Sequence, residues 1–394
     1  MQLSFCIIVK NEEQNLPQCL RSVQDWVDEM IVLDTGSSDR TVEIARSFGA
    51  QVHSFDWCND FSAARNACLK YAQGDWVLVL DADETLVAEV APILRSAIEQ
   101  EEYLVFNLVR REVGAAQSPY SLVSRLFRRH PELWFSRPYH EMIDDQVLLL
   151  LQHEPHWKIG AVSEVAILHE GYQADVIAGR DKVNRARSTM EAFLAAHPND
   201  PYVCSKLGAL YVGVGETAKG IELLERGLSA VEDASTKYEL HYHLGVVYSE
   251  LNEIEKAAQQ YQEAIRQAVL PKLKLGAINN FASLLKDCGD LQNAALLYQQ
   301  ALDIDPTFAI AYCNLGATLK AMGQFTTAID HYHQAIALNP NYAEAYQNLG
   351  VVLLNLGRVP QSLEAFRTAI ALHQQQNPSE AERLKLGLRE MGLW

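Results

Sequence analysis

The sequence has few features of a membrane, secreted or nucleic-acid-binding protein. No stretch approaches the roughly 20 consecutive apolar residues of a membrane-spanning helix, and residues 1–13 contain an apolar core too short for a signal peptide. Basic residues are outnumbered, with 33 Lys and Arg against 50 Asp and Glu, for a formal net charge of −17. Because a phosphate backbone requires a clustered basic surface, this composition argues against nucleic acid as a partner.

Paired cysteines are also missing. The seven cysteines stand singly in the sequence, with no CxxC motif and an odd total. Such usage is typical of a reducing compartment and argues against a disulfide framework or a structural zinc site. We therefore expect a cytoplasmic protein that has no membrane span.

What the sequence does contain is two halves with different periodicities. The length of 394 residues favours two domains. Up to about residue 171, short β-branched runs alternate with amphipathic segments. This βαβ rhythm predicts a largely parallel sheet covered by helices. The expected strands are 3–9, 29–34, 51–55 and 75–81, and the expected helices are 12–27, 40–48 and 61–72.

The second half repeats itself every 34 residues. Asn280, Asn314 and Asn348 recur at this interval, and the same spacing separates Gly289, Gly323 and Gly357. A helix-turn-helix unit of this length with small residues at fixed positions is the tetratricopeptide repeat (TPR) pattern. We expect about five repeats within residues 200–394, ending in a cap helix near 379–391. An unrelated all-helical domain is the alternative.

The strongest chemical motif follows the fourth expected strand. Asp81 and Asp83 stand two residues apart, so on an extended backbone their side chains would share one face. Paired carboxylates at a strand end are hard oxygen ligands, suited to Mn²⁺ or Mg²⁺ bound to a diphosphate. The alternative is a simple turn. Glu84 could support this site or be a solvated neighbour.

Four ordered motifs give this half a specific resemblance. IIVKNEE (7–13), DTGSSDRT (34–41), DFSAARN (60–66) and LDADE (80–84) occur in the order seen in a bacterial branch of the family 2 glycosyltransferases. The resemblance spans roughly residues 1–171 and implies an α/β GT-A domain with a Rossmann-like, mixed and mainly parallel sheet. It implies that Val9, Asn11 and Glu12 line the nucleotide base. Asp34 would form a hydrogen bond with the base, which is expected to be a uracil. Arg65 would approach the base or diphosphate, Asp81 would contact the ribose or metal-bound waters, and Asp83 would ligate the metal.

The acceptor side resembles the same branch over residues 124–143. Family 2 enzymes invert the anomeric centre, which requires a base to take the proton of the acceptor. Glu141 is the candidate base, with His140 beside it; a surface loop is the alternative. The QxxRW motif of processive synthases is absent, which argues against polymer synthesis. His169 follows another apolar strand and is a candidate third ligand of the metal or diphosphate, or else a buried core histidine.

These expectations define one domain organisation and three candidate functions. Residues 1–178 would form the glycosyltransferase domain, 179–199 a helical linker and 200–394 the all-α TPR solenoid. The favoured function is that of an inverting, metal-dependent hexosyltransferase whose donor is a UDP-linked nucleotide-sugar. The repeats would recruit a protein or peptide partner in their groove. The alternatives are a TPR interaction scaffold with an inactive transferase domain and a nucleotidyltransferase. The latter requires a Gly-rich basic loop, which residues 9–13 do not provide.

Overall fold

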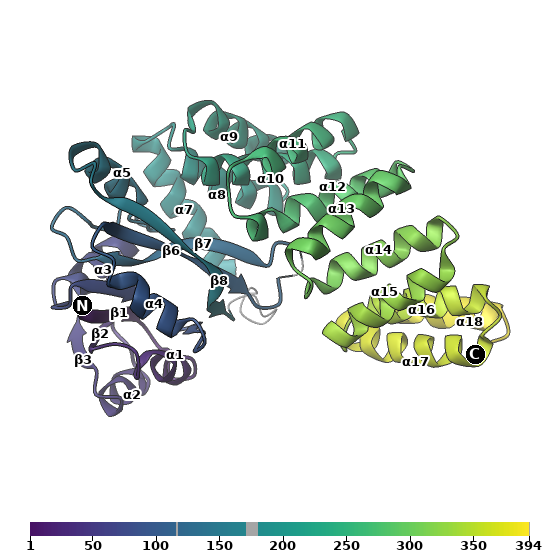
Figure 1. The fold of residues 1–394 in the computed structure, drawn as a ribbon, viewed down its shortest axis with the longest axis horizontal. Coiled ribbons are helices and arrows are strands. Elements are labelled where there is room, and N and C mark those ends of the chain that lie inside the picture. The colour runs from purple at the N-terminus through teal and green to yellow at the C-terminus, as the bar shows by residue number, and fades with distance from the viewer. Residues whose placement is uncertain (116, 171–179, 394) are drawn as a thin grey trace. The chain divides into compact units, whose positions relative to one another are not determined.

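The computed structural model describes residues 1–115, 117–170 and 180–393 (Figure 1). The chain divides into two compact units, Met1–Ala230 and Val231–Trp394. The first unit contains the sheet, its helices and the first pair of repeat helices. The boundary expected between residues 178 and 179 falls outside the described residues, so the division into 1–178, 179–199 and 200–394 stays a prediction.

The first unit is built on an eight-stranded mixed sheet in the order β3-β2-β1-β4-β7-β6-β8-β5 (Figure 1). The four strands β3, β2, β1 and β4 are mutually parallel, as the βαβ rhythm predicts. Strand β7 is antiparallel to β4 and β6, β8 is parallel to β6, and β5 is antiparallel to β8. The α/β class with a mixed sheet is thus confirmed. The strands are β1 (Leu3–Val9), β2 (Glu29–Asp34), β3 (Gln51–Ser54), β4 (Trp76–Val79), β5 (Glu84–Leu86), β6 (Tyr103–Glu112), β7 (Tyr120–Arg128) and β8 (Lys158–His169).

Helices cover both faces of this sheet because its central strands are apolar on both sides. Along β1, Phe5 and Ile7 join the apolar cluster beneath α1 and α4, whereas Cys6 joins the opposite cluster beneath α3 and α5. This alternation is the two-residue period of an extended strand. With both faces covered, the polar side chains at the strand ends are the ones left accessible. The helices are α1 (Leu16–Val23), α2 (Thr41–Ser47), α3 (Phe61–Leu69), α4 (Ala91–Ile98) and α5 (Asp144–His153).

Among the described residues, the first unit also contains α7 (Arg180–Ala196), α8 (Pro201–Gly213) and α9 (Thr217–Ala230). Asp200 caps α8, its side chain accepting a hydrogen bond from the Val203 amide at 2.8 Å. A cluster of buried side chains from α7 and α8, including Met190 and Leu207, holds these helices together. The pair α8 and α9 is the first of the five expected repeats.

The second unit is a stack of helix pairs that ends in a single helix (Figure 1). Every expected repeat from residue 235 onward corresponds to one pair, so the solenoid is confirmed. The pairs are α10 (Ala234–Glu250) with α11 (Ile254–Arg266), α12 (Leu275–Asp287) with α13 (Leu291–Ile304), α14 (Ala309–Ala321) with α15 (Phe325–Leu338), and α16 (Ala343–Asn355) with α17 (Val359–Gln376). The short helix η1 (Pro271–Lys274) precedes α12, and α18 (Pro378–Glu390) is the cap.

The repeat pattern is explained by one contact made again in successive pairs. A Cβ added at Gly316 would lie 2.8 Å from the ring of Tyr332, and one at Gly350 would lie 3.0 Å from the ring of Phe366. The small residue therefore lets the large aromatic of the second helix lie against the first. At the turn between the two helices, Gly323 has a φ of 77°, a conformation that glycine adopts without strain.

One local expectation was wrong. The segment with Asp81 and Asp83 is not extended, because β4 ends at Val79 and β5 begins at Glu84. Hydrogen bonds in both directions fold it into a turn: the Glu84 amide donates to the Asp81 carbonyl at 3.0 Å, and the Asp81 amide donates to the Glu84 carboxylate at 2.9 Å. The two aspartates therefore meet different partners.

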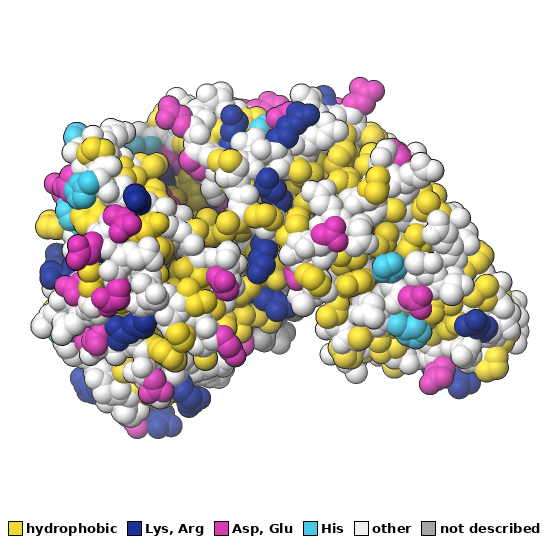
Figure 2. All heavy atoms as spheres, viewed as in Figure 1, with side chains coloured by type: hydrophobic (Ala, Val, Ile, Leu, Met, Phe, Trp, Pro, Cys, Tyr) yellow, Lys and Arg dark blue, Asp and Glu magenta, His cyan; other side chains and the backbone are white. Residues whose placement is uncertain are grey.

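The surface in Figure 2 carries acidic and basic side chains interspersed with apolar ones. On this face, the described Lys and Arg side chains do not merge into a continuous basic band. Within the described ranges, no helix combines the length and the apolarity needed to cross a membrane.

Candidate active site

The polar residues predicted from the sequence gather where β1, β2 and β4 end. The chain first builds outward from β1 to β2 and β3, and then returns to place β4 on the other side of β1. In open α/β sheets, ligands bind beyond the carboxyl ends of the strands at such a reversal. The structure therefore brings Asn11, Glu12, Asp34 and the turn at Asp81 to one end of the sheet.

The loops after β1 and β2 are joined to each other. Val9 pairs with Asp34 in the sheet register. Asn11, at a φ of 57°, donates its amide to the Ser37 hydroxyl at 2.9 Å, and its side chain accepts from the Ser38 amide at 2.8 Å. Asparagine is among the few residues that tolerate this left-handed conformation. The two loops are thus held in one arrangement before any ligand arrives.

Asp34 is oriented by its own turn. It is buried, and its carboxylate accepts hydrogen bonds from the amides of Gly36 at 3.2 Å and Ser37 at 3.1 Å. The side chain therefore supports the turn between β2 and α2, and its proposed contact with a nucleotide base stays a prediction.

Glu12 lies on the approach to the acidic turn. Burial raises the pKa of its carboxyl group, with a further contribution from the charges of Asp83 and Asp81. The side chain accepts a hydrogen bond from Asn15 at 2.9 Å. Its position close to both aspartates agrees with a place in the same site.

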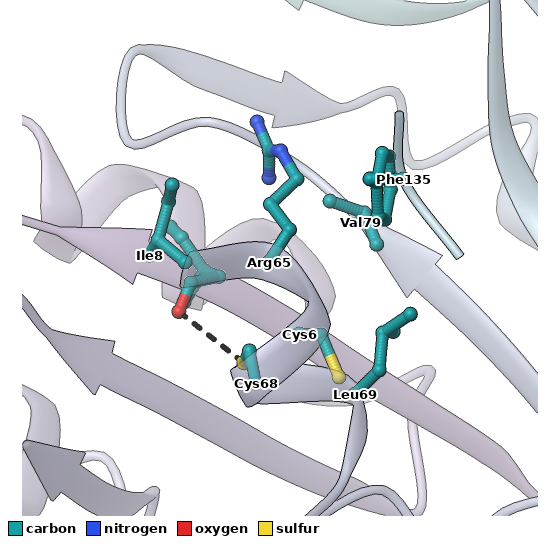
Figure 3. A pocket seen from close by; sticks show the side chains of 8 residues that line it. Cys6, Ile8, Arg65, Cys68, Leu69, Val79 and Phe135 are labelled. Carbon is teal, nitrogen blue, oxygen red and sulfur yellow. Dashed lines mark hydrogen bonds between the residues drawn. The ribbon is translucent and has the colours of Figure 1, made fainter. Parts of the chain in front are cut away.

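Arg65 is the central cation of the site. Figure 3 shows its side chain extending from α3, with Ile8 on one side and Val79 and Phe135 on the other. The guanidinium carbon lies 5.5 Å from the centre of the Phe135 ring, and the void among these residues has no room for a water molecule. Only 3% of the residue is exposed. A charge so deeply buried requires partners of opposite sign.

Two carboxylates provide those partners from distant parts of the chain. Arg65 donates to Asp81 through Nη2 and to Glu141 through Nε, and Arg125 on β7 also donates to Asp81 at 3.1 Å. Burial alone would raise the pKa of Asp81, but the charges of Arg65 and Arg125 hold it well below its usual value. Asp81 and Glu141 are therefore held by one guanidinium group, with Asp81 ionised.

A second network supports the turn from below. Glu84 is fully buried and accepts from Arg110 on β6 at 2.7 Å, and the same arginine reaches Glu112 at 2.9 Å. Glu112 in turn holds Nδ1 of His169 at 2.5 Å, and Nε2 of His169 lies 3.3 Å from the Asp83 carboxylate. Glu84 is thus a structural support of the acidic turn rather than a solvated neighbour.

The pairing of Asp83 with His169 suits a divalent cation. A carboxylate that fixes one nitrogen of a histidine, while the other nitrogen faces the metal position, is the usual arrangement around metal-bound histidines. Burial opposes protonation of His169, but hydrogen bonds to Asp83 and Glu112 raise its pKa to about 10. Protonated, the imidazole ring neutralises the charge of Asp83; to ligate a cation through Nε2, His169 would have to release that proton.

The described residues do not form a ready-made metal cage. Among them, no three His, Cys, Asp or Glu side chains are grouped so that they could enclose an ion. Asp81 faces the arginines, whereas Asp83 faces His169. Mg²⁺ and related ions are commonly held by only one or two carboxylates together with substrate phosphates and water. The donor set therefore fits a cation that is completed by a bound diphosphate.

The two candidate bases are separated by the loop that carries them. Glu141 turns inward to Arg65, and its side chain is only 10% exposed. His140 is exposed, with a φ of 54°, and its ring lies 4.8 Å from that of Tyr139 and 6.5 Å from that of Tyr202. Of the two, Glu141 is the one that belongs to the cluster of charged groups around Asp81.

Sequence reasoning missed Arg110, Glu112 and Arg125. A signal was present for two of them, because Arg110 and Glu112 stand two residues apart within an apolar strand and so share a face. Charged residues at such positions are seldom buried without a partner. No comparable signal pointed from Arg125 to Asp81, which is 44 residues away.

Comparisons with known sequence families divide the chain in the same way as its fold. The family described as glycosyl transferase family 2 matches residues 4–160. Tetratricopeptide repeat families match residues 238–268, 282–323, 318–357 and 343–384.

Individual relatives extend these matches. A TPR repeat-containing protein of Synechococcus elongatus is 45% identical over 306 residues, which cover 77% of this chain and 76% of the relative. The SPbeta prophage-derived glycosyltransferase SunS of Bacillus subtilis is 28% identical over 204 residues, 50% of this chain and 46% of SunS. An uncharacterized glycosyltransferase of Rickettsia typhi is 35% identical over 113 residues, 27% of this chain and 37% of that protein. The chain thus spans less than half the length of these two glycosyltransferases.

Solved structures that are similar to this chain include MamA and YrrB. MamA has 19% sequence identity and a TM-score of 0.38, with 45% of this chain and 94% of MamA covered. YrrB, described as a TPR protein with an unusual peptide-binding site, has 18% identity and a TM-score of 0.39, with 50% of this chain and 97% of YrrB covered.

Proposed function

Because this chain belongs to the family 2 glycosyltransferases that carry tetratricopeptide repeats, we propose that it transfers a sugar from a UDP-linked donor to an acceptor hydroxyl, with inversion and with the help of Mn²⁺ or Mg²⁺. The observation that carries the proposal is the convergence of Asp81, Asp83, Arg65 and Glu141 at the ends of the parallel strands. An enzyme of this kind must hold a diphosphate, orient the sugar and remove one proton.

The donor would lie across the joined loops after β1 and β2 and reach the acidic turn. Asn11 and Asp34 shape those loops, while Asp83 and His169 supply the cation ligands. A cation bound there offsets negative charge that develops on the departing nucleoside diphosphate. Five carboxylates of this region face three arginines and one histidine, which leaves room for additional positive charge. These groups are Asp81, Asp83, Glu84, Glu112 and Glu141, facing Arg65, Arg110, Arg125 and His169.

Glu141 would remove the proton from the acceptor. Arg65 donates a hydrogen bond to its Oε1 and orients the carboxylate, so that the second oxygen can accept a proton. His140, at the exposed outer side of the loop, is less well placed for this task. In such a mechanism Arg65 fixes the distance between the base and the diphosphate end of the donor, because it touches both Asp81 and Glu141.

The repeats would recruit a protein or peptide partner, since stacked helix pairs form extended surfaces for binding. The alternative of a scaffold with an inactive transferase domain is less well supported. Decay of the site would be expected to break at least one of its buried ion pairs, whereas Arg65 and Arg110 each retain two carboxylate partners.

The proposal is tested by thermal unfolding of the full chain with UDP, UDP-glucose, UDP-galactose and UDP-N-acetylglucosamine, each with and without Mn²⁺. A ligand at 100 times its dissociation constant stabilises a protein by about 2.7 kcal/mol. We expect stabilisation by UDP that requires Mn²⁺, and its loss in Asp83→Asn. The matched control is Asp75→Asn, at the opposite end of β4, where the carboxylate accepts a hydrogen bond from the amide of the exposed Gln2 at 2.8 Å.

Two results would contradict the proposal at different levels. If none of the UDP ligands stabilises the wild-type chain, the proposal that the donor is UDP-linked is wrong. If the stabilisation persists in Asp83→Asn at the same Mn²⁺ concentration, Asp83 is not a metal ligand. The proposal of a UDP-linked donor would still stand.

A further inference from the structure

The loop that carries Glu141 has a strained and tightly fixed backbone. We call residues 136–142 the Glu141 loop. Ser136 and Met142 close it, exchanging backbone hydrogen bonds of 2.9 and 3.2 Å. Between them, Arg137 and His140 have φ values of 70° and 54°. Left-handed conformations of residues other than glycine cost about 1 kcal/mol or more each, so contacts outside the loop must hold them in place.

Arg137 provides the main external contact, and it reaches two different elements. Its guanidinium donates to Asp145 on α5 at 2.6 Å and to Asp200 at 2.8 Å. Only 6% of the Arg137 side chain is exposed. Both carboxylates raise the pKa of this arginine against the opposing effect of burial. Arg137 thus joins the sheet region to the helix that opens the first repeat.

Asp200 serves two roles at this junction. Its Oδ1 caps α8 through the Val203 amide, while its Oδ2 accepts from Nε and Nη2 of Arg137 at 3.2 and 2.8 Å. The start of α8 is therefore fixed to the loop by the same side chain that fixes the helix. Since buried, charge-assisted bonds to a guanidinium are strong and directional, this link constrains position as well as distance.

Aromatic contacts reinforce the same junction. Tyr202 in the first turn of α8 lies beneath Arg137, with the guanidinium carbon 5.3 Å from its ring centre. Tyr139 of the loop packs against the apolar cluster of α7 and α8, and its ring lies 5.7 Å from that of Phe61 on α3. On the α3 side, the Phe61 amide donates to the Pro138 carbonyl at 3.1 Å. The Glu141 loop is thus held between α3 and the first repeat helix.

We propose that Arg137 is a positioning residue of the transferase, which uses the first repeat helix to fix the carboxylate of Glu141 against Arg65. The proposal builds on the proposed function, in which Glu141 takes the acceptor proton. It makes the pair α8 and α9 a working part of the catalytic unit, in agreement with the compact unit that extends to Ala230. Without the Arg137 bridge the strained loop would relax, and Glu141 would leave its place relative to Asp81.

The test uses the full chain and three variants. Arg137→Met removes the bridge, Arg137→Lys keeps the charge without the fork, and Asp200→Asn keeps the helix cap while it weakens the ion pair. Asparagine and aspartate are similarly good caps. The matched control is Asp233→Asn, which makes the same change at the cap of α10, where Asp233 accepts from the Thr236 amide at 2.7 Å.

Two measurements separate positioning from general stability. Amide hydrogen exchange of peptides that cover residues 136–142 should accelerate about tenfold in Arg137→Met, because local opening loses a charge-assisted bond. Hydrolysis of whichever of the three UDP-sugars gives the largest thermal shift should lose about 10- to 100-fold in kcat, while the dissociation constant of UDP with Mn²⁺ stays the same. Arg137→Lys and Asp200→Asn should lie between wild type and Arg137→Met, and Asp233→Asn should match wild type in both measurements.

Unchanged exchange in the Glu141 loop of Arg137→Met would overturn the proposal, whatever the activity. Accelerated exchange with an unchanged kcat would also overturn it, because the loop would then be held for stability alone. If the wild-type chain neither binds UDP nor hydrolyses the three sugars, the proposed function fails, and the exchange measurement still decides whether Arg137 fixes the loop.

Discussion

The two units of this chain are each stabilised by a different kind of internal contact. In the first unit, the site depends on buried charges from segments that lie far apart in the sequence: Arg65 pairs with Glu141, which is 76 residues away, and Arg125 pairs with Asp81, which is 44 residues away. In the second unit, the main contact is apolar and local. Gly245 and Tyr261, only 16 residues apart, recur in later repeats as Gly316 with Tyr332 and Gly350 with Phe366.

This difference explains where function can be placed. Repeated local contacts tolerate variation in any one repeat, since each unit depends on its neighbours only. A buried charge network has the opposite character, because removal of one member leaves the others without partners in a medium of low polarity. The first unit thus has the preorganised charges needed for chemistry, and it is correspondingly sensitive to single changes.

The largest effect is expected for Arg65→Met. Loss of this guanidinium leaves Glu141 and part of the Asp81 charge uncompensated, and breaking such a buried pair costs about 3–5 kcal/mol. Five of the six tryptophans lie before residue 158, so tryptophan fluorescence in urea follows the first unit, whereas ellipticity at 222 nm is dominated by the repeat helices. The fluorescence midpoint should fall while the helical transition of the second unit stays in place.

A double variant controls this experiment. In Arg65→Met with Glu141→Gln, the uncompensated carboxylate is replaced by a neutral amide, so part of the lost stability should return. A fluorescence midpoint equal to that of wild type in the single variant would show that Arg65 does not hold the first unit together.

The next largest effect is expected for an alanine substitution at a glycine contact of the second unit. In Gly245→Ala the new Cβ would lie 2.6 Å from the ring of Tyr261, which is 2% exposed and has no room to withdraw. Overpacking of this kind costs about 1–3 kcal/mol. The same substitution at Gly387 in α18 meets nothing within 4 Å and should instead stabilise its helix by about 0.5–1 kcal/mol.

Both changes are followed by ellipticity at 222 nm in urea, with fluorescence as the internal reference for the first unit. If Gly245→Ala lowers the urea midpoint and Gly387→Ala raises it, the cost at Gly245 comes from its contact with the ring of Tyr261. Equal shifts for the two variants would mean that the glycine is not required by the neighbouring ring.

The sequence predicted the repeats almost completely and the site only in part, for the same reason. A contact made at a fixed spacing of 34 residues leaves a periodic signal, so the glycines, alanines and aromatics of the helix pairs could be counted directly. The ordered motifs of the first half likewise located Asn11, Asp34, Arg65 and Asp81 near the strand ends.

What the sequence could not provide was the choice of partners. Nothing near Asp81 in the sequence indicates that Arg125 would approach it, or that Glu84 would be buried under Arg110. These pairs are set by the register between β4, β5, β6 and β7, which depends on the whole sheet. The expected extended backbone at Asp81 and Asp83 failed for a related reason, because Glu84 folds the segment back onto itself.

The smallest effect concerns an arginine–carboxylate pair in the second unit, matched in chemistry to the pair of Arg65. Glu380, in the first turn of α18, accepts hydrogen bonds from Arg383 at 2.7 Å and from Gln347 on α16 at 2.9 Å, and Arg383 itself is 66% exposed. The hydrogen bonds from Arg383 lower the pKa of Glu380 to about 2. An exposed pair of this kind is worth less than about 1 kcal/mol, against the larger value expected for the buried pair.

The pH dependence gives this small effect a distinctive sign. A folded pKa of about 2 lies below the value of about 4.3 for an unfolded glutamate, so the contribution is fully present above pH ~4.3 and disappears as the pH falls towards 2. Glu380→Gln should therefore lower the urea midpoint of the 222 nm transition at pH 7, and the difference from wild type should narrow by pH 3. A difference that is equally large at both pH values would show that the charge of Glu380 is not the source of its contribution. The exposed pair of Glu380 and Arg383 could then no longer be compared with the buried ion pairs of Arg65. The contrast between the two units would rest on the apolar contacts of the repeats alone.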